Sequence, residues 1–350
     1  MSRQRVAVLL GGRSGEHEVS ITSARSVMAA LDAERWEVVP IGISRSGNWL
    51  TPGETMADLA AGNRAFVTNG QPMLRAHDAL AALASCDVAF PLVHGTYGED
   101  GTLQGFLELA GIPYAGAGVA ASAIGMDKAL MKALFKESGI PVARYSVIRS
   151  WEYTLAPNDS MALIDRAIGY PCFVKPANGG SSVGVSRARS REDLHDAFAA
   201  AFAYDDKAVV EQAVIGREVE CSVLGNEYPE ASVIGEIVPD RDFYDYDSKY
   251  AATSTTQLYI PAPITEAVSR EIRDLAVRMY QVMGCEGYAR VDFFLTSADK
   301  VYANEINTIP GFTSISMYPK LWEASGLPYS QLLTRILELA LARHERRSNR

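Results

Sequence analysis

The sequence predicts an α/β protein in which a parallel sheet is covered by helices. Short apolar strands alternate with helical stretches in the first third of the chain, and Gly11 and Gly12 end the first strand, residues 5–10. This alternation is typical of parallel sheets, whose strands are joined through helices. The chain has 350 residues, which at about 150 residues per domain predicts roughly two domains, with three possible. Its 48% apolar and 21% charged residues are those of an ordinary globular protein.

The elements of the first third follow from this pattern. Strands are expected at 5–10, 38–43, 86–93 and 112–115, and helices at 20–31 and 103–110. Functional residues of parallel sheets collect at the carboxyl ends of the strands. The loops 11–16 and 94–101 are therefore candidate site loops.

The rest of the chain adds further strands and helices. An amphipathic helix is expected at 127–138, closed by Gly139 and Pro141. Residues 239–263 form a polar, tyrosine-rich stretch, and a loop of that length in a compact domain predicts a functional lid or disorder. The other expected elements are strands at 171–175, 208–212, 219–224 and 232–238, helices at 191–204, 266–283 and 330–342, a hairpin at 288–307 and a solvated tail.

Charge and cysteine content exclude several classes of protein. The 33 Lys and Arg residues against 42 Asp and Glu residues leave a net charge of −9, whereas a nucleic-acid binder would need a basic surface. No apolar run approaches about 18 residues and the N-terminus has no signal-peptide pattern, so we expect a cytoplasmic protein without membrane contact. The four cysteines form no CxxC pair and predict buried thiols rather than disulfides or a zinc site.

The hairpin predicts a cluster of oxygen ligands. With Leu295 opposite Lys300, Arg290 lies opposite Glu305 and Asp292 opposite Ala303. Because side chains alternate along a strand, one face carries Arg290, Asp292, Phe294, Val301, Ala303, Glu305 and Asn307, and the other carries Val291, Phe293, Leu295, Tyr302 and Ile306. Two carboxylates and an amide oxygen suit Mg²⁺, which binds few carboxylates together with substrate phosphates. Since the register is assumed, the alternative is a solvated polar face with an Arg290–Glu305 ion pair.

A second pattern, residues 175–184 (KPANGGSSVG), predicts a lid over the phosphates of a nucleotide. Glycines let backbone N–H groups approach an anion closely, serine hydroxyls add donors, and Lys175 supplies charge. The alternative is a mobile surface hairpin. It is not a Walker A loop, because no Gly-Lys in the chain is followed by Ser or Thr. Lys128 could be a second phosphate ligand or an ordinary exposed lysine.

Two other patterns are weaker. Residues 116–121 (GAGVAA) fit the dinucleotide pattern G-x-G-x-x-A, but they do not follow the first strand, and no acidic residue ends a strand about 20 residues later. We interpret them as a tight strand-to-helix turn. Glu16, at the carboxyl end of the first strand, could hold a substrate ammonium. The five histidines show no metal-binding spacing.

Together these motifs resemble those of the D-alanine–D-alanine ligases of the ATP-grasp superfamily. The resemblance covers nearly the whole chain in the family's order, and eight modest motifs in one order are highly specific together. The matching stretches are LLGGRSGEHEVS (9–20), VHGTYGEDGTLQG (93–105), MDK (126–128), FVKPANGGSSVG (173–184), VEQAVIGREVE (210–220), FYDYDSKY (243–250), RVDFF (290–294) and NEINTIPGFTSIS (304–316).

The resemblance implies a three-domain ATP-grasp fold. Residues 1–122 would bind the first amino acid, and residues 123–217 and 218–350 would grip ATP between two sheets. The residues implied to bind ATP are Lys128 and Lys175 at the phosphates, Glu211 with its neighbours Gln212 and Val214 at the adenine pocket, and Glu218 at the ribose hydroxyls. Ser182 and Asn304 are implied to bind the nucleotide as well. Two Mg²⁺ or Mn²⁺ ions would be held by Asp292, Glu305 and Asn307.

The resemblance also implies which residues bind the amino acids. Glu16, assisted by His94, would bind the ammonium of the first D-alanine. Arg290 and the backbone near Gly311 would stabilise the oxyanion. Ser181 and Tyr250 would link Glu16 to the lid loops, one of which carries Lys249. Ser316 and Met317 would contact the second D-alanine. A homodimer through the first domain is implied as well.

The implied reaction joins two D-alanines through an acyl phosphate, releasing ADP and phosphate, for peptidoglycan precursor synthesis. Three alternatives stay open. A D-alanine–D-lactate ligase is disfavoured by Tyr250, and another ATP-grasp carboxylate–amine ligase would not explain Glu16 and the Tyr250 loop. A non-enzymatic nucleotide-binding protein would be expected to lack part of the set Arg290, Asp292, Glu305 and Asn307.

Overall fold

The computed structural model describes residues 3–238, 256–313 and 315–349, and in this part of the chain three sheets follow one another. The first is five-stranded, the second four-stranded and the third five-stranded. Two predicted site residues, Lys249 and Tyr250, lie outside the described residues. No helix in the described part is long and apolar enough to cross a membrane.

The first sheet has the strand order β4-β3-β2-β1-β5, and β1 pairs in parallel with both β2 and β5, as predicted. Its elements are β1 (Gln4–Gly11), α1 (His17–Ala30), β2 (Trp36–Ile43), β3 (Asn48–Trp49), α2 (Pro52–Ala60), β4 (Gln71–Pro72), the 3-10 helix η1 (Met73–Arg75), α3 (His77–Ala84), β5 (Val88–Pro91) and α4 (Thr102–Leu109).

Both faces of β1 are buried, which explains its unbroken apolar run. Val6, Val8 and Leu10 pack in one core with α1, whereas Ala7 and Leu9 pack in another with α3 and α4. The expected strand at 112–115 is wrong. That segment forms only a single bridge, between Ala89 and Tyr114, before the chain leaves the sheet.

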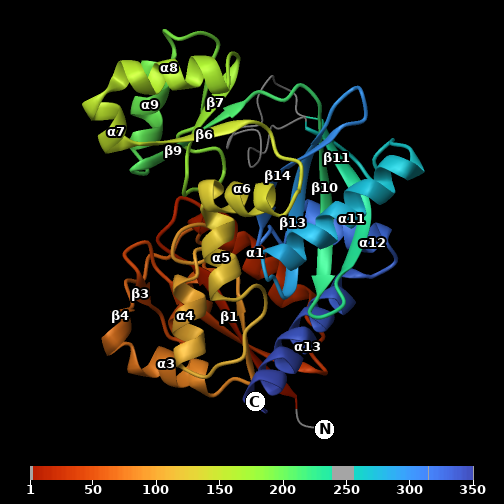
Figure 1. The fold of residues 1–350 in the computed structure, drawn as a ribbon. Coiled ribbons are helices and arrows are strands. Elements are labelled where there is room, and N and C mark those ends of the chain that lie inside the picture. The colour runs from red at the N-terminus through yellow and green to blue at the C-terminus, as the bar shows by residue number, and fades with distance from the viewer. Residues whose placement is uncertain (1–2, 239–255, 314, 350) are drawn as a thin grey trace.

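The second sheet has the order β6-β9-β7-β8, and it lies with α7–α9 at one end of the molecule in Figure 1. The elements of this segment are α5 (Val119–Met126), α6 (Lys128–Glu137), β6 (Tyr145–Arg149), α7 (Ser150–Leu155), α8 (Pro157–Ala167), β7 (Cys172–Pro176), β8 (Ser186–Ala188), α9 (Leu194–Phe202) and β9 (Lys207–Gln212). Gly116 has φ +94°, which a glycine tolerates, and α5 begins at Val119, so residues 116–118 turn into a helix as predicted, although a single bridge rather than a strand precedes them. Sequence analysis missed β6, α7 and α8.

The third sheet has the order β12-β11-β10-β13-β14. Its elements are β10 (Arg217–Gly225), β11 (Glu230–Val238), β12 (Gln257–Tyr259), α11 (Glu266–Val282), β13 (Gly287–Leu295), β14 (Val301–Asn307), α12 (Met317–Ala324) and α13 (Tyr329–Ser348). β12 falls within the stretch 239–263 that was expected to be a lid or disordered.

The C-terminal tail, predicted to be solvated or frayed, is helical rather than frayed, because α13 continues to Ser348. Glu345 and Arg347 in it are exposed, as predicted. Arg343 on this helix is buried and donates to the carbonyls of Tyr114 (2.5 Å) and Gly116. Apolar residues of α13, among them Leu333 and Ile336, join the core of the first sheet. The last helix therefore fastens the third segment to the first, beside which it lies in Figure 1.

The hairpin register differs from the predicted one. Arg290 pairs with Asn307 and Asp292 with Glu305, and an irregularity then shifts Phe293 opposite Ala303. Asn304 is thus an extra residue in β14, a β-bulge that reverses which side chains face the core. Val301 and Ala303 were expected on the polar face, but both lie in the core. Arg290, Asp292, Glu305 and Asn307 still share one face, because the bulge lies outside the part of the hairpin in which they pair.

The expectation of thiols is confirmed. All four cysteines are free; Cys172, Cys221 and Cys285 are buried, and Cys86 is half-buried.

Candidate active site

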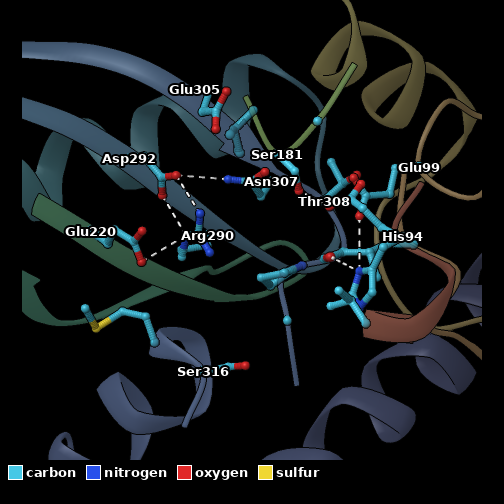
Figure 2. Close-up of a pocket in the computed structure, with 18 of the residues that line it drawn as sticks. His94, Glu99, Ser181, Glu220, Arg290, Asp292, Glu305, Asn307, Thr308 and Ser316 are labelled. Atoms are coloured by element: carbon cyan, nitrogen blue, oxygen red, sulfur yellow. Dashed lines mark hydrogen bonds and ion pairs between the residues drawn. The ribbon is translucent and has the colours of Figure 1, made fainter. Parts of the chain in front are cut away.

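A cavity of about 1130 Å³ is lined by residues from all three segments (Figure 2). Among the site residues predicted from the sequence, the lining includes Glu16, His94, Lys128, Ser181, Glu218, Arg290, Asp292, Asn304, Glu305, Asn307, Gly311, Ser316 and Met317. Predicted site residues that lie more than a hundred positions apart in the sequence therefore line the same cavity.

Glu16 lies at the start of α1, directly after the loop that ends β1. Ser181 Oγ donates to Glu16 Oε1 at 2.5 Å, although the two residues are 165 positions apart. A side chain on Gly180 would come within 2.9 Å of Glu16 Oε2, so the glycine lets the loop approach this closely. Ser181 and Ser182 both have positive φ, a backbone conformation that is uncommon outside glycine. The glycine-serine loop, residues 175–184, therefore contacts the first segment at Glu16.

His94 is buried, and both of its ring nitrogens contact protein groups. Nδ1 lies 2.9 Å from the carbonyl of Ile309 and 3.4 Å from Glu99 Oε1, and Nε2 lies 3.1 Å from Ser23 Oγ. Burial alone would lower the pKa of His94, but Glu99 and Glu16 outweigh it and raise the pKa. Burial raises the pKa of Glu99 to about 7, although His94 opposes this. In this arrangement His94 connects the first segment to the 308–313 loop of the third.

This buried pair predicts a pH-dependent stability. A carboxyl whose pKa is raised on folding, here from 4.5 to about 7, stabilises the fold at low pH, and the contribution is lost as pH rises. His94 acts in the same direction, because its folded pKa is also raised. We expect the free energy of unfolding of Glu99→Gln, minus that of the wild type, to increase by about 1–2 kcal/mol between about pH 5 and pH 8. Urea unfolding at a series of pH values measures this, and a level or falling difference would contradict it.

The polar face of the hairpin is occupied by an ionic network (Figure 2). Arg290 contacts both oxygens of Asp292 at 2.7 Å, and its Nε lies 3.0 Å from Glu220 Oε2. Asn307 Nδ2 donates to Asp292 Oδ2 at 3.0 Å. The alternative considered above was a solvated face with an Arg290–Glu305 ion pair. The guanidinium instead pairs with Asp292 and Glu220 on a largely buried face. Burial would lower the pKa of Arg290, but these two carboxylates raise it.

The same face offers hard oxygen donors for a divalent cation. Asp292 and Glu305 supply carboxylates and Asn307 supplies an amide oxygen, a set that suits Mg²⁺ or Mn²⁺. Within the described ranges, no three His, Cys, Asp or Glu side chains form a complete ligand set. The set therefore fits an ion whose remaining ligands are phosphate oxygens and water.

Of the predicted nucleotide-binding residues in the second segment, Lys128 lines this cavity. Lys175 Nζ donates to Glu211 Oε2 at 2.8 Å, and Lys128 Nζ donates to the carbonyl of Gly179 at 2.5 Å. The lining does not include Lys175, Ser182, Glu211, Gln212 or Val214. Gln212 instead accepts a hydrogen bond from Arg144 (2.9 Å).

A loop at the other end of the cavity precedes α12. Ser316 Oγ lies 2.7 Å from Thr313 Oγ1 and accepts from Thr313 N at 3.0 Å. Ser316 stands immediately before α12, and the N-terminus of a helix is a position that suits an anion. Met317 is buried at the start of that helix, and Gly311 lies against Ser316.

Sequence reasoning missed three ionisable residues of this region. Glu99 lies in the matched stretch 93–105, where it could have been examined with His94. Lys132 stands one helical turn after Lys128, a spacing that places both on one side of a helix. Glu220 ends the matched stretch 210–220, but its contact with Arg290 comes from the pairing of β10 with β13, which that stretch does not show.

Comparisons with known proteins agree with this architecture. The family models described as D-ala D-ala ligase N-terminus and C-terminus match residues 5–117 and 134–338. The D-alanine–D-alanine ligase of Natranaerobius thermophilus is 46% identical over 354 residues, covering 99% of this chain and 97% of that protein.

Solved structures confirm the expected α/β fold of the ATP-grasp ligases. The D-alanine–D-alanine ligase from Coxiella burnetii superimposes with a TM-score of 0.82 at 38% identity, covering 99% of this chain and 98% of that one. The VanG D-Ala:D-Ser ligase from Enterococcus faecalis has a TM-score of 0.81 at 32% identity, covering 97% and 100%. With two family models and a near full-length relative in agreement, the chain belongs to the D-alanine–D-alanine ligase family.

Proposed function

We propose that this protein uses ATP to join two D-alanines into D-alanyl-D-alanine, releasing ADP and phosphate, as a step of peptidoglycan precursor synthesis. The observation that carries the proposal is the single cavity in which Glu16, the polar face of the hairpin and the Ser316 loop meet. These groups match the three needs of the reaction: an ammonium site, stabilisation of transferring phosphate, and a carboxylate site.

The first D-alanine would bind with its ammonium at Glu16, whose carboxylate is held by Ser181 (2.5 Å). An oxygen of the amino acid's carboxylate attacks the γ-phosphorus of ATP, forming an acyl phosphate and ADP. Lys128 and Lys175 would stabilise the charge on the phosphates. His94 positions the 308–313 loop rather than the ammonium, since both of its ring nitrogens contact protein groups.

The second D-alanine would bind with its carboxylate at Ser316 and the N-terminus of α12. Its deprotonated amine attacks the acyl carbon, and the tetrahedral oxyanion would be stabilised by Arg290 and the backbone near Gly311. Phosphate then leaves and the peptide bond remains. Water would hydrolyse the acyl phosphate, so the 175–184 loop and the segment with Lys249 and Tyr250 are proposed as lids.

The divalent cation site is proposed at Asp292, Glu305 and Asn307. Two Mg²⁺ or Mn²⁺ ions there would neutralise charge on the β- and γ-phosphates. The nucleotide contacts proposed for Ser182, Glu211, Gln212, Val214, Glu218 and Asn304, and the substrate contact of Met317, rest on the family resemblance.

The organisation of the protein is proposed on the same basis. The domains would be 1–122, 123–217 and 218–350, with a homodimer formed through the first. We also propose a cytoplasmic location, since ATP is available there and four free thiols are typical of a reducing compartment.

The experiment that tests this function is an assay of phosphate release with ATP, Mg²⁺ and D-alanine. We expect release that depends on D-alanine, with D-alanyl-D-alanine as the product. Competition with D-lactate and with D-serine at neutral pH tests the second site, since a relative of similar structure is named for D-serine. A depsipeptide or a D-alanyl-D-serine product in excess over the dipeptide would overturn the choice of second substrate.

A further inference from the structure

Lys132 is a buried lysine that the proposed reaction does not use. It lies on α6, one turn after Lys128, and its side chain is 1% exposed. Its Nζ donates to Glu211 Oε1 at 2.5 Å and contacts the backbone carbonyl of Asn304 at 3.4 Å. A buried ammonium needs such partners, because burial without them would disfavour its charged form.

Glu211 is shared between two lysines. Its Oε1 accepts from Lys132 and its Oε2 from Lys175 at 2.8 Å, while the carboxylate itself is 3% exposed. Burial would raise the pKa of Glu211, but the two lysines lower it to about 2, so it is ionised. The three side chains together carry a net charge of +1, as two ammonium groups and one carboxylate.

The contact with Asn304 extends this cluster to the third sheet. Asn304 is the bulge residue of β14 and directly precedes Glu305 on the polar face. Lys132 therefore joins α6, β9 of the second sheet and β14 of the third. These elements stand on both sides of the proposed nucleotide site.

We infer that Lys132 is a positioning residue for the polyphosphate of the nucleotide. By sharing the Glu211 carboxylate it leaves net positive charge at Lys175, and by holding Asn304 it places Glu305 against the second sheet. Without Lys132, Glu211 and Lys175 would form a neutral pair. This inference rests on the proposed function only in taking the ligand to be a nucleotide.

The first test measures binding of Mg²⁺·ADP to the full chain by calorimetry. We expect Lys132→Met to weaken binding about tenfold, because Glu211 then neutralises Lys175 beside the phosphates. In turnover assays the KM for ATP rises while kcat at saturating ATP changes by less than about threefold. Lys132→Arg keeps the charge and is expected to restore most of the affinity. Lys136→Met, at an exposed lysine in the last turn of the same helix, is the matched control and leaves binding unchanged.

A second test separates charge from a merely structural role. In the Glu211→Gln background no carboxylate remains to neutralise Lys175, so Lys175 keeps its charge whether or not Lys132 is present. We therefore expect the loss caused by Lys132→Met to shrink by at least about threefold in the Glu211→Gln background. An equal loss in both backgrounds, or no loss in either, would overturn the inference.

If Lys132→Met alone does not fold, the double variant is compared with Glu211→Gln alone, and a full loss of about tenfold in affinity between these two proteins overturns the inference. The outcome is distinguishable from failure of the proposed function. A wild-type protein that binds Mg²⁺·ADP but releases no phosphate with D-alanine overturns the function and leaves the Lys132 test intact. If the wild type is active but Lys132→Met binds Mg²⁺·ADP as tightly as the wild type does, only this inference is overturned.

Discussion

Replacing Glu305 with glutamine is expected to lower kcat by about two to three orders of magnitude while the protein stays folded. The substitution keeps the shape of the side chain and removes one of the two carboxylates, with Asp292, on the proposed cation site. Fewer negative charges hold the cation, and less charge is neutralised on the transferring phosphate. Phosphate release at saturating ATP and D-alanine measures the effect, and a Mg²⁺ titration should show a higher requirement.

The control lies on the same hairpin. Asp299 is exposed in the turn between β13 and β14, and Asp299→Asn makes the same carboxylate-to-amide change away from the cavity. We expect its kcat to match that of the wild type. If Glu305→Gln keeps most of its rate while circular dichroism shows both variants folded, the cation assignment is wrong.

Arg290→Met is expected to damage both catalysis and stability. The guanidinium is the shared partner of Asp292 and Glu220, both of which are buried. Removing it leaves buried carboxylates without compensation, which costs about 3–5 kcal/mol. Loss of an oxyanion contact lowers kcat by a further factor of about 100 to 1,000. Urea unfolding measures the first effect, and turnover at a temperature where the variant is folded measures the second.

Two further variants separate these effects. Adding Glu220→Gln to Arg290→Met removes one uncompensated carboxylate, so stability should recover in part while kcat stays low. Arg335→Met breaks an exposed ion pair with Glu230 and should change stability by no more than about 1 kcal/mol. A folded Arg290→Met protein with an unchanged kcat would remove Arg290 from the oxyanion site.

The hairpin illustrates how far sequence reasoning reaches. Alternation along each strand places Arg290 with Asp292 and Glu305 with Asn307. All four share one face because the observed register there differs from the assumed one by two residues, which leaves the faces unchanged. The pairing partners were wrong, and so was the side assigned to Val301 and Ala303. A bulge costs little energy and leaves no mark in the local pattern, so its position is set by the packing of both strands on the core.

By itself, the sequence determined the parallel first sheet, the helix 127–138, the glycine-serine loop and the hairpin, because each is marked by a local pattern of residue types. It also determined which motifs occur and in what order, and hence the family. Only the tertiary structure decided that Ser181 reaches Glu16, that Arg343 fastens the last helix to the first segment, and that Lys132 shares Glu211 with Lys175. These contacts join residues 36 to 229 positions apart, and the energy of each depends on burial that no local pattern encodes.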